Sequence, residues 1–302
     1  MGNESLELIR HAPWSSFVVL FTMPLTIEVP ASTTNLGPGF DCLGAALRLC
    51  NRIIIEVDVN ERPAPAIVSE ATELFFSRTG EKRFPIRCSV EGDVPQARGL
   101  GSSVTIRLGV LMALDRLTNR RLPREELCSL CAELEGHPDN AAAALFGGFT
   151  IIASTNRRVA RFDIDPTLKF VLFVPDFEVK TSEARTVVPG VFQRQAVVEN
   201  LANASLIAAA FASKEYGYLR GAFLDHLHQP FREQFVPFLP KVLRAAMEAG
   251  ALGGFLSGSG STVACLTLSD GKEVAAAIAA AAPEAHAKTL IVSADNDGAR
   301  FL

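Results

Sequence analysis

The sequence predicts an α+β fold, because strand-like and helix-like patterns follow one another in mixed order along its 302 residues. Alternating or short apolar runs indicate strands at 25–29, 53–59, 84–90, 148–153 and 170–174. Helical spacing of apolar residues covers 102–118, 123–135, 194–213, 215–228 and 237–249, and an alanine-rich helix is expected at 275–282. The change from strand-rich to helix-rich sequence near 170–190 indicates a domain boundary there.

Composition excludes several classes of protein. A hydrophobic content of 48% and a charged content of 21% are typical of a folded chain, long enough for a sizeable core. The net charge of −4 argues against nucleic acid as the main partner, since phosphate backbones are bound by clustered cations. The apolar stretch 14–21 has only about eight residues, too few to cross a bilayer. No membrane partner is therefore expected.

The cysteines point to a reducing compartment. All six lie scattered in hydrophobic segments, which is typical of reduced thiols and not of a disulfide framework. Cys128 and Cys131 form a Cys-x-x-Cys pair, but no second pair or histidine set accompanies it to build a metal site. We therefore expect a cytoplasmic protein.

A glycine-rich turn leads into the helix predicted at 102–118. It reads Arg98-Gly99-Leu100-Gly101-Ser102-Ser103. The glycines let the backbone bend tightly and approach a ligand, and the first N–H groups of a helix have no partner within it. Such N–H groups, together with the helix dipole, favour an anion, so the segment predicts a phosphate-binding loop. A capped helix after a tight turn is the alternative interpretation.

Three further segments accompany this loop. They are the stretch 29–44 with Gly37-Pro38-Gly39-Phe40-Asp41 at its centre, Glu135-Gly136-His137-Pro138-Asp139-Asn140, and the stretch 253–262. In this order and at this spacing, the four segments resemble the GHMP kinase superfamily, which includes galactokinases, homoserine kinases and mevalonate kinases. The motif sequences are most similar to those of homoserine kinases, and the resemblance runs from about Met23 to about Leu268.

The resemblance implies a two-domain GHMP kinase fold. An N-terminal ATP-binding domain at 23–172 would contain a left-handed β-α-β crossover, and a C-terminal domain at 173–302 would be ferredoxin-like. The active site would lie in the cleft between them. Residues 1–22 remain as an N-terminal extension of uncertain role, with Met23 as an alternative start.

The nucleotide side of the expected site follows from the same resemblance. Phosphoryl transfer needs held phosphates, a divalent cation and an acceptor hydroxyl placed in line. The residues expected to contact ATP are Pro95, Arg98, Gly99, Leu100, Gly101, Ser102, Ser103, Gly258 and Gly260. Mg²⁺ would take oxygen ligands from Ser103 and Glu135, with Glu133 as the alternative to Glu135.

An acceptor that carries both an ammonium and a carboxylate requires opposite charges held apart. By resemblance, Asp41 would pair with the ammonium, and Arg185 and Arg232 would grip the carboxylate with their planar forks. Further substrate contacts are expected from Asn35, His137 and Asn140. Asp139 and Asn140 are the catalytic candidates, and they would polarise the hydroxyl by positioning it. Asp139 as a true base, as in mevalonate kinases, is the alternative.

The activity implied is ATP-dependent phosphorylation of the side-chain hydroxyl of L-homoserine to O-phospho-L-homoserine, in threonine biosynthesis. The alternatives are a GHMP kinase for another small alcohol and a non-catalytic ligand-binding relative. The chain departs from the usual pattern at 141–144, at 259–262 and in Val104-Thr105-Ile106-Arg107 after the nucleotide loop, but no catalytic group is lost. The oligomeric state stays open, and a homodimer is compatible with the sequence.

Overall fold

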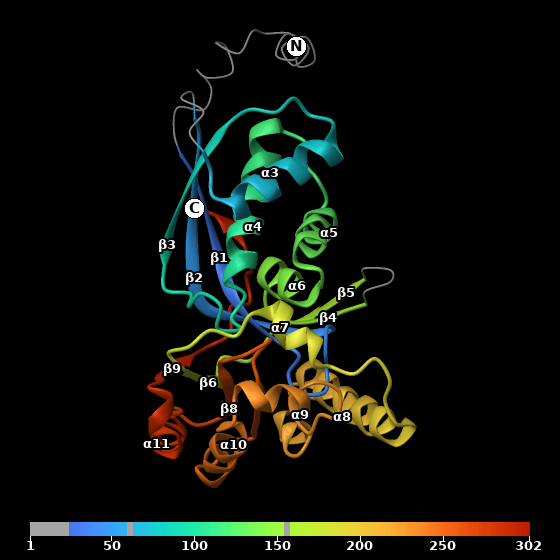
Figure 1. Ribbon diagram of the computed structural model, residues 1–302, viewed down its shortest axis with the longest axis vertical. Coiled ribbons are helices and arrows are strands. Elements are labelled where there is room, and N and C mark those ends of the chain that lie inside the picture. Colours follow the sequence, from blue (N-terminus) through green and yellow to red (C-terminus); the bar gives the residue numbers. More distant parts are fainter. Residues whose placement is uncertain (1–23, 59–62, 154–157) are drawn as a thin grey trace.

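The chain folds around two antiparallel sheets that lie one beyond the other along its long axis (Figure 1). The computed structural model describes residues 24–58, 63–153 and 158–302, so the expected extension at 1–22 lies outside the described residues. The first sheet has the order β10-β1-β2-β4-β5, with β3 also paired to β2. Its strands are β1 (Leu25–Thr34), β2 (Leu43–Val57), β3 (Ile86–Gly92), β4 (Phe149–Ile152), β5 (Val159–Phe162) and β10 (Arg300–Phe301).

The long β2 strand organises this sheet. One end pairs with β4 and the other with β3, while β1 runs along its opposite edge. The short β10 returns the C-terminus to β1. Consequently β1 and β2 are anchored on both sides, and the loop that joins them, residues 35–42, is held at the end facing the second sheet.

Four helices pack on one face of the first sheet (Figure 1). They are α3 (Ala66–Thr79), α4 (Ser102–Thr118), α5 (Arg124–Glu135) and α6 (Asp139–Phe146). The helix predicted at 102–118 is confirmed as α4, which is largely buried because α3, α5 and the sheet surround it. Gly109 allows its close approach, since a Cβ there would lie 2.5 Å from the Cβ of Ile53. Helices α4 to α6 form the connection from β3 to β4, for which the resemblance predicts a left-handed crossover.

The second sheet has the order β7-β8-β6-β9, and all of its pairings are antiparallel. Its elements are β6 (Lys169–Val174), α10 (Leu239–Glu248), β7 (Gly253–Leu256), β8 (Val263–Thr267), α11 (Lys272–Ala281), the 3₁₀ turn η3 (Pro283–Ala285) and β9 (Lys288–Val292). Helices α10 and α11 pack together against one face. This β-α-β-β-α-β arrangement is ferredoxin-like, which confirms the predicted α+β two-domain fold.

A helical segment links β6 to α10. It contains α7 (Thr181–Thr186), α8 (Arg194–Ser213), η1 (Tyr216–Leu219), α9 (Gln229–Arg232) and η2 (Glu233–Phe235). The helix predicted at 215–228 is wrong, because only η1 forms there. Gly221 takes a positive φ of 78°, and the Asp225 carboxylate accepts from the N–H groups of 227–229, which starts α9 instead.

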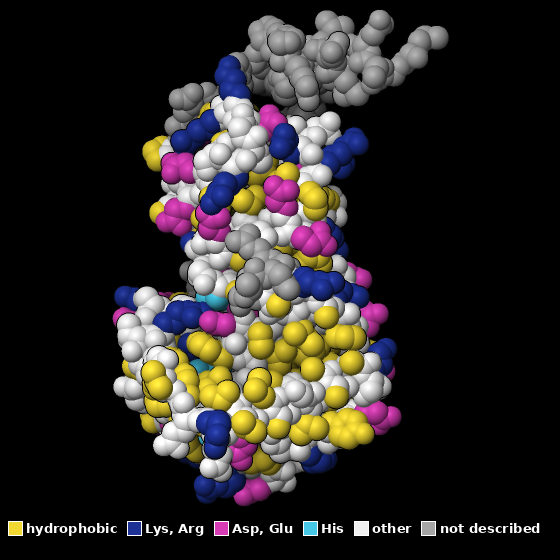
Figure 2. Space-filling model, turned by 90° about the vertical axis from the view of Figure 1, so that its right-hand side faces the viewer, with side chains coloured by type: hydrophobic (Ala, Val, Ile, Leu, Met, Phe, Trp, Pro, Cys, Tyr) yellow, Lys and Arg dark blue, Asp and Glu magenta, His cyan; other side chains and the backbone are white. Residues whose placement is uncertain are grey.

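The helix α8 lies on the outside of this segment. Among the described helices, it alone has the length and apolar composition of a membrane-crossing segment, and 22% of that window is buried. Its packed side includes Phe211, whose ring stacks on Phe149 of β4 at 4.2 Å between centroids. Its other side exposes Val198, Leu201 and Leu206. Figure 2, which looks at the side of the molecule where α8 lies in Figure 1, shows hydrophobic side chains gathered on its lower half.

Candidate active site

The predicted site residues converge on one cavity of about 220 Å³ between the two sheets. Its walls come from the loop after β1, the start of α4, the α5–α6 turn, α7, α9 and the β7–β8 turn. Of the predicted residues, only Pro95 and Gly260 lie outside the lining. The alternative metal ligand Glu133 also lies outside it, where it pairs with Arg78 at 2.5 Å between Oε1 and Nη2. The four motifs therefore build a single site.

The nucleotide loop is shaped by two glycines in the left-handed region, Gly99 at φ 72° and Gly101 at φ 69°. A Cβ on Gly99 would lie 2.1 Å from the carbonyl oxygen of Ser257, and one on Gly101 would lie 2.3 Å from the hydroxyl of Ser32. Gly101 caps α4, and among the described residues no side chain accepts from the N–H groups of the first turn. They remain available for an anion such as phosphate.

The β7–β8 turn packs directly on this loop. The Ser257 hydroxyl donates to the carbonyl of Gly99 at 2.6 Å, and Asn35 Nδ2 donates to the carbonyl of Gly258 at 2.9 Å. Gly258 and Ser259 reach the cavity, whereas Gly260 turns the chain with its N–H donated to Ser257 at 2.8 Å. Arg98 lies at the rim, where its Nε donates to the carbonyl of Pro175 at 3.0 Å.

Oxygen donors lie beside the start of α4. Ser103 Oγ donates to Oε2 of Glu135 at 3.0 Å, and Arg107 Nη1 lies 2.5 Å from Oε1 of the same carboxylate. The Glu135 side chain is 9% exposed. A hydroxyl and a carboxylate next to a phosphate-binding loop are the hard oxygen donors that Mg²⁺ prefers, so the donor set fits this ion.

Opposite charges meet on the acceptor side of the cavity. Arg185 donates to both oxygens of Asp41, at 2.6 and 3.0 Å, in a bidentate ion pair. Phe40 lies under two guanidinium groups, those of Arg185 at 5.6 Å and Arg232 at 5.0 Å from its ring centroid. One carboxylate and two guanidinium groups therefore face the same space.

Arg232 is 2% exposed and is held from several directions. Its Nε donates to the carbonyl of Ala184 and its Nη1 to that of Gly258, both at 3.0 Å. Burial, together with the charge of Arg185, lowers the pKa of Arg232 to about 10. The guanidinium therefore stays charged at neutral pH.

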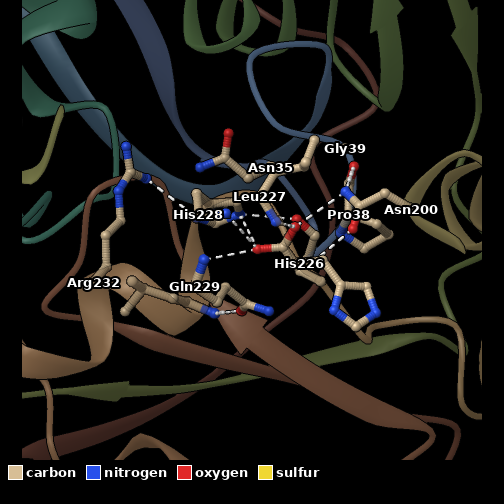
Figure 3. Close-up of polar contacts among 12 residues, drawn as sticks. Asn35, Pro38, Gly39, Asn200, His226, Leu227, His228, Gln229 and Arg232 are labelled. Carbon is tan, nitrogen blue, oxygen red and sulfur yellow. Dashed lines mark hydrogen bonds and ion pairs between the residues drawn. The ribbon is translucent and has the colours of Figure 1, made fainter. Parts of the chain in front are cut away.

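His228 lies beside Arg232 and contacts its guanidinium (Figure 3), and the N–H of His228 donates to the Asp225 carboxylate at 3.0 Å. Burial lowers the pKa of His228 to about 4, so the ring is neutral at pH 7. Its Nε2 donates to the carbonyl of Gly37 at 2.8 Å, which leaves Nδ1 to accept from Arg232 at 3.3 Å. His226 points away from His228, and its Nε2 lies 2.9 Å from Oε2 of Glu199.

A buried polar cluster lies at the start of α6. His137 Nδ1 lies 2.6 Å from Asp139 Oδ1, which also accepts from the N–H of Asn140 at 2.9 Å. The Asn140 side chain accepts from Ser32 Oγ at 2.8 Å and donates to Thr34 Oγ1 at 3.2 Å. These contacts fix the orientation of the amide at the cavity wall.

Asp139 and His137 shift each other's pKa. Burial alone would raise the pKa of Asp139, but the hydrogen bond and charge of His137 outweigh it and lower that pKa. Burial alone would lower the pKa of His137, but the hydrogen bond and charge of Asp139 raise it. Asp41, His137 and Asp139 place ligand atoms within 4.8 Å of one another. Each carboxylate already has a cationic partner, Arg185 for Asp41 and His137 for Asp139.

The raised pKa of His137 predicts a pH-dependent stability. The protonated His137 ring has Asp139 as its partner only in the folded state. Its contribution to the free energy of unfolding is therefore complete below pH 6.5 and is lost as the pH rises through the raised pKa of the folded state. In His137→Gln, the free energy of unfolding should therefore decrease less above pH 6.5 than it does in the wild type. Urea unfolding at several pH values measures this, with exposed His286→Gln as control. An unchanged pH profile for His137→Gln would contradict the assignment.

The structure adds residues that the sequence analysis did not single out. Ser32 and Thr34 orient Asn140, while Lys180, Thr181 and Ser259 line the cavity. Ser32, Thr34 and Ser259 lie inside segments already quoted, and Lys180 and Thr181 lie shortly before the predicted Arg185, so this proximity was the available signal. Arg107 is different: only its unusual position after the nucleotide loop marked it.

Two family comparisons match the two halves of the fold. The family "GHMP kinases N terminal domain" matches residues 66–148, and "GHMP kinases C terminal" matches residues 197–285. The glycine-rich loop at the start of α4 and the cavity beside it thus define a kinase of the GHMP class.

Similar proteins of known name show which family within the GHMP class the chain belongs to. The chain is 35% identical to a homoserine kinase of Caldicellulosiruptor bescii, over 91% of this chain and 96% of that protein. It is 36% identical to a homoserine kinase of Aquifex aeolicus, over 91% and 99%. A solved homoserine kinase from Cytophaga hutchinsonii has the same fold, with a TM-score of 0.82, 23% identity and coverage of 92% and 97%. The chain belongs to the homoserine kinase family.

Proposed function

We propose that this chain transfers the γ-phosphoryl group of ATP to the side-chain hydroxyl of L-homoserine. One observation carries the proposal: the Asp41–Arg185 pair and Arg232 line the same cavity as the anion-binding start of α4. The curated relatives are named homoserine kinases, which supports L-homoserine as the acceptor. The product would be O-phospho-L-homoserine, a precursor for threonine biosynthesis.

The nucleotide would be held at the start of α4. The N–H groups around Gly99 and Gly101 would bind phosphate oxygens, and the β7–β8 turn would close over them with Gly258. Glu135 and Ser103 would hold Mg²⁺, which supplies neutralisation of charge on the phosphates when bound. The protein groups thereby orient the phosphates toward the acceptor side of the cavity.

The acceptor would be recognised by an exchange of ion pairs. Asp41 and Arg185 neutralise each other in the ligand-free chain. A zwitterionic amino acid offers the ammonium to Asp41 and the carboxylate to Arg185 and Arg232, so each charge of the site keeps an opposite partner. Mevalonate offers a carboxylate to Arg185 but no ammonium to Asp41, and galactose offers neither charge, so neither completes this exchange.

The reacting hydroxyl would be placed by Asp139 and Asn140. Asp139 is 1% exposed, and its Oδ1 is already shared between His137 and the N–H of Asn140. This arrangement favours catalysis by positioning over proton removal by a free carboxylate.

Substitutions separate these two roles. Asp139→Asn should lower kcat less than tenfold if Asp139 positions the site, whereas loss of an obligatory base costs roughly 10²–10⁴-fold. Asn140→Ala should lower kcat without rescue by high Mg²⁺, because no metal replaces an oriented amide. Steady-state kinetics at several Mg²⁺ concentrations measures both. A drop of several orders of magnitude for Asp139→Asn would establish a base.

A coupled ADP-release screen tests the proposed activity. Purified protein with Mg²⁺ and ATP is offered L-homoserine, mevalonate, galactose, shikimate and threonine. We expect rapid ADP release with L-homoserine alone. Preference for another alcohol would overturn the substrate and keep a GHMP kinase, and no release with any acceptor would favour a non-catalytic relative.

We also propose a cytoplasmic homodimer. In the described part of the chain, which contains all six cysteines, no disulfide forms, as expected in a reducing compartment. Residues 200–213 of α8 carry no charged side chain, and the exposed Val198, Leu201 and Leu206 leave an apolar face on the surface. The same face on a second copy offers a matching uncharged surface in a two-fold arrangement.

The oligomeric state tests this face. Wild-type protein should sediment as a dimer, and Leu201→Glu should sediment as a monomer, because the new carboxylate would be buried without a partner. Met247→Glu is the matched control, since this residue is also exposed on a helix but lies on α10. A wild-type monomer, or equal behaviour of the two variants, would contradict the proposal.

A further inference from the structure

Arg107 links the nucleotide loop to the carboxylate beside it. It lies four residues after Ser103 on α4, so both side chains lie on the same side of the helix. Its Nη1 lies 2.5 Å from Oε1 of Glu135, and its Nη2 lies 2.9 Å from Oε2 of Glu70. Ser103 occupies the other oxygen of Glu135 at 3.0 Å. Both carboxylate oxygens of Glu135 therefore already have a donor.

The surroundings make this contact strong. The side chain of Glu135 is 9% exposed and that of Arg107 is 15% exposed, so water screens the two charges less than at the surface. Arg107 Nε is buried without a hydrogen-bond partner among the described residues, and the guanidinium contacts the two carboxylates through Nη1 and Nη2. Burial alone would lower the pKa of Arg107, but Glu135 and Glu70 raise it. Arg107 is thus a permanent cation.

A fixed cation next to Glu135 changes what the carboxylate can bind. A divalent cation that approaches Glu135 meets a guanidinium that already neutralises it and repels like charge. Nucleotide phosphates at the start of α4 add the negative charge that the empty site lacks. The binding of the metal should therefore depend strongly on whether the nucleotide is bound, and the reverse.

We propose that Arg107 is a positioning residue that orients Glu135 and prevents a divalent metal from binding before the nucleotide. The proposal rests on the proposed metal role of Glu135. It also explains the departure from the usual sequence at 104–107: this arginine sets the order in which metal and nucleotide enter.

Binding of Mn²⁺, followed by its electron paramagnetic resonance signal, tests this order without turnover. Wild-type protein should bind Mn²⁺ weakly alone and much more tightly with ADP. Arg107→Met should bind Mn²⁺ without nucleotide at least tenfold more tightly than wild type, with a difference of less than about threefold once ADP is present. Arg107→Lys, which keeps the charge, should stay close to wild type. Retained ADP binding by each variant shows that it is folded.

Two controls separate the possible failures. Arg78→Met removes the partner of exposed Glu133 and should leave Mn²⁺ binding unchanged. Glu135→Gln should weaken Mn²⁺ binding in the presence of ADP, and an unchanged affinity would overturn the metal role of Glu135 together with the inference. If Glu135→Gln weakens binding but Arg107→Met binds nucleotide-free Mn²⁺ as wild type does, the inference on Arg107 alone is wrong. Neither outcome depends on whether L-homoserine is the acceptor.

Discussion

Replacing Arg185 by lysine is expected to raise the KM for L-homoserine by tenfold or more and to leave the KM for ATP nearly unchanged. Arg185 binds both oxygens of Asp41, a geometry that only a planar fork provides. Lysine keeps the charge but loses the fork, so both the ligand-free pair and the grip on a carboxylate should weaken. Truncating one partner of a fully desolvated charge pair costs about 2–5 kcal/mol. The Arg185 and Asp41 side chains are 35% and 30% exposed, so solvent screening places this loss at or below the low end of that range.

The matched control is Arg194→Lys, at the exposed start of α8. It should change neither KM. Arg232→Lys should also raise the KM for L-homoserine. The Arg232 guanidinium lies over the same Phe40 ring as that of Arg185 and lines the same cavity. An unchanged KM for L-homoserine in both Arg185→Lys and Arg232→Lys would show that the carboxylate is held elsewhere.

The second large effect is expected at Glu135. Glu135→Gln should lower kcat by about a hundredfold at ordinary Mg²⁺, in the range found when one stabilising group is removed from a transition state. The amide keeps the shape and can still accept from Ser103, but it loses the charge that attracts a divalent cation. Part of the loss should return at high Mg²⁺.

Glu133→Gln is the internal comparison for this prediction. Glu133 lies two residues earlier, outside the cavity and paired with Arg78, so its replacement should leave the Mg²⁺ dependence unchanged. Rescue of Glu133→Gln by metal, without rescue of Glu135→Gln, would move the proposed ligand to Glu133. Kinetics across a series of Mg²⁺ concentrations distinguishes the two carboxylates.

Local patterns predicted some of the elements that carry the site, namely β1, α4 and α5, but not α6, α7, α9, β7 or β8. The helix at 102–118 has an uninterrupted apolar pattern between a glycine turn and Asn119, which ends it with a positive φ of 53°. The predicted helix at 215–228 failed because its apolar spacing was overridden by Gly221 and by the Asp225 carboxylate, which together form a turn. The two-residue strand β10 and the four-residue β5 are too short to show a period.

The gathering of site residues depends on contacts between distant segments. Ser32 and Asn140 are 108 positions apart, and Arg185 and Asp41 are 144 apart. No local pattern contains such pairs, so resemblance to a family supplied these residues and the structure supplied their partners. The Arg107–Glu135 contact spans 28 positions and departs from the family pattern, which is why neither route predicted it.

The central claim is that a zwitterion exchanges partners with Asp41 and Arg185 beside a phosphate-binding helix. The most direct test compares kcat/KM for L-homoserine with two analogues at saturating Mg²⁺ and ATP. One is 4-hydroxybutyrate, which lacks the ammonium, and the other is 3-aminopropan-1-ol, which lacks the carboxylate. The account predicts that each analogue loses at least about a hundredfold, since each leaves one desolvated charge without its partner. An analogue that is phosphorylated as efficiently as L-homoserine would contradict it.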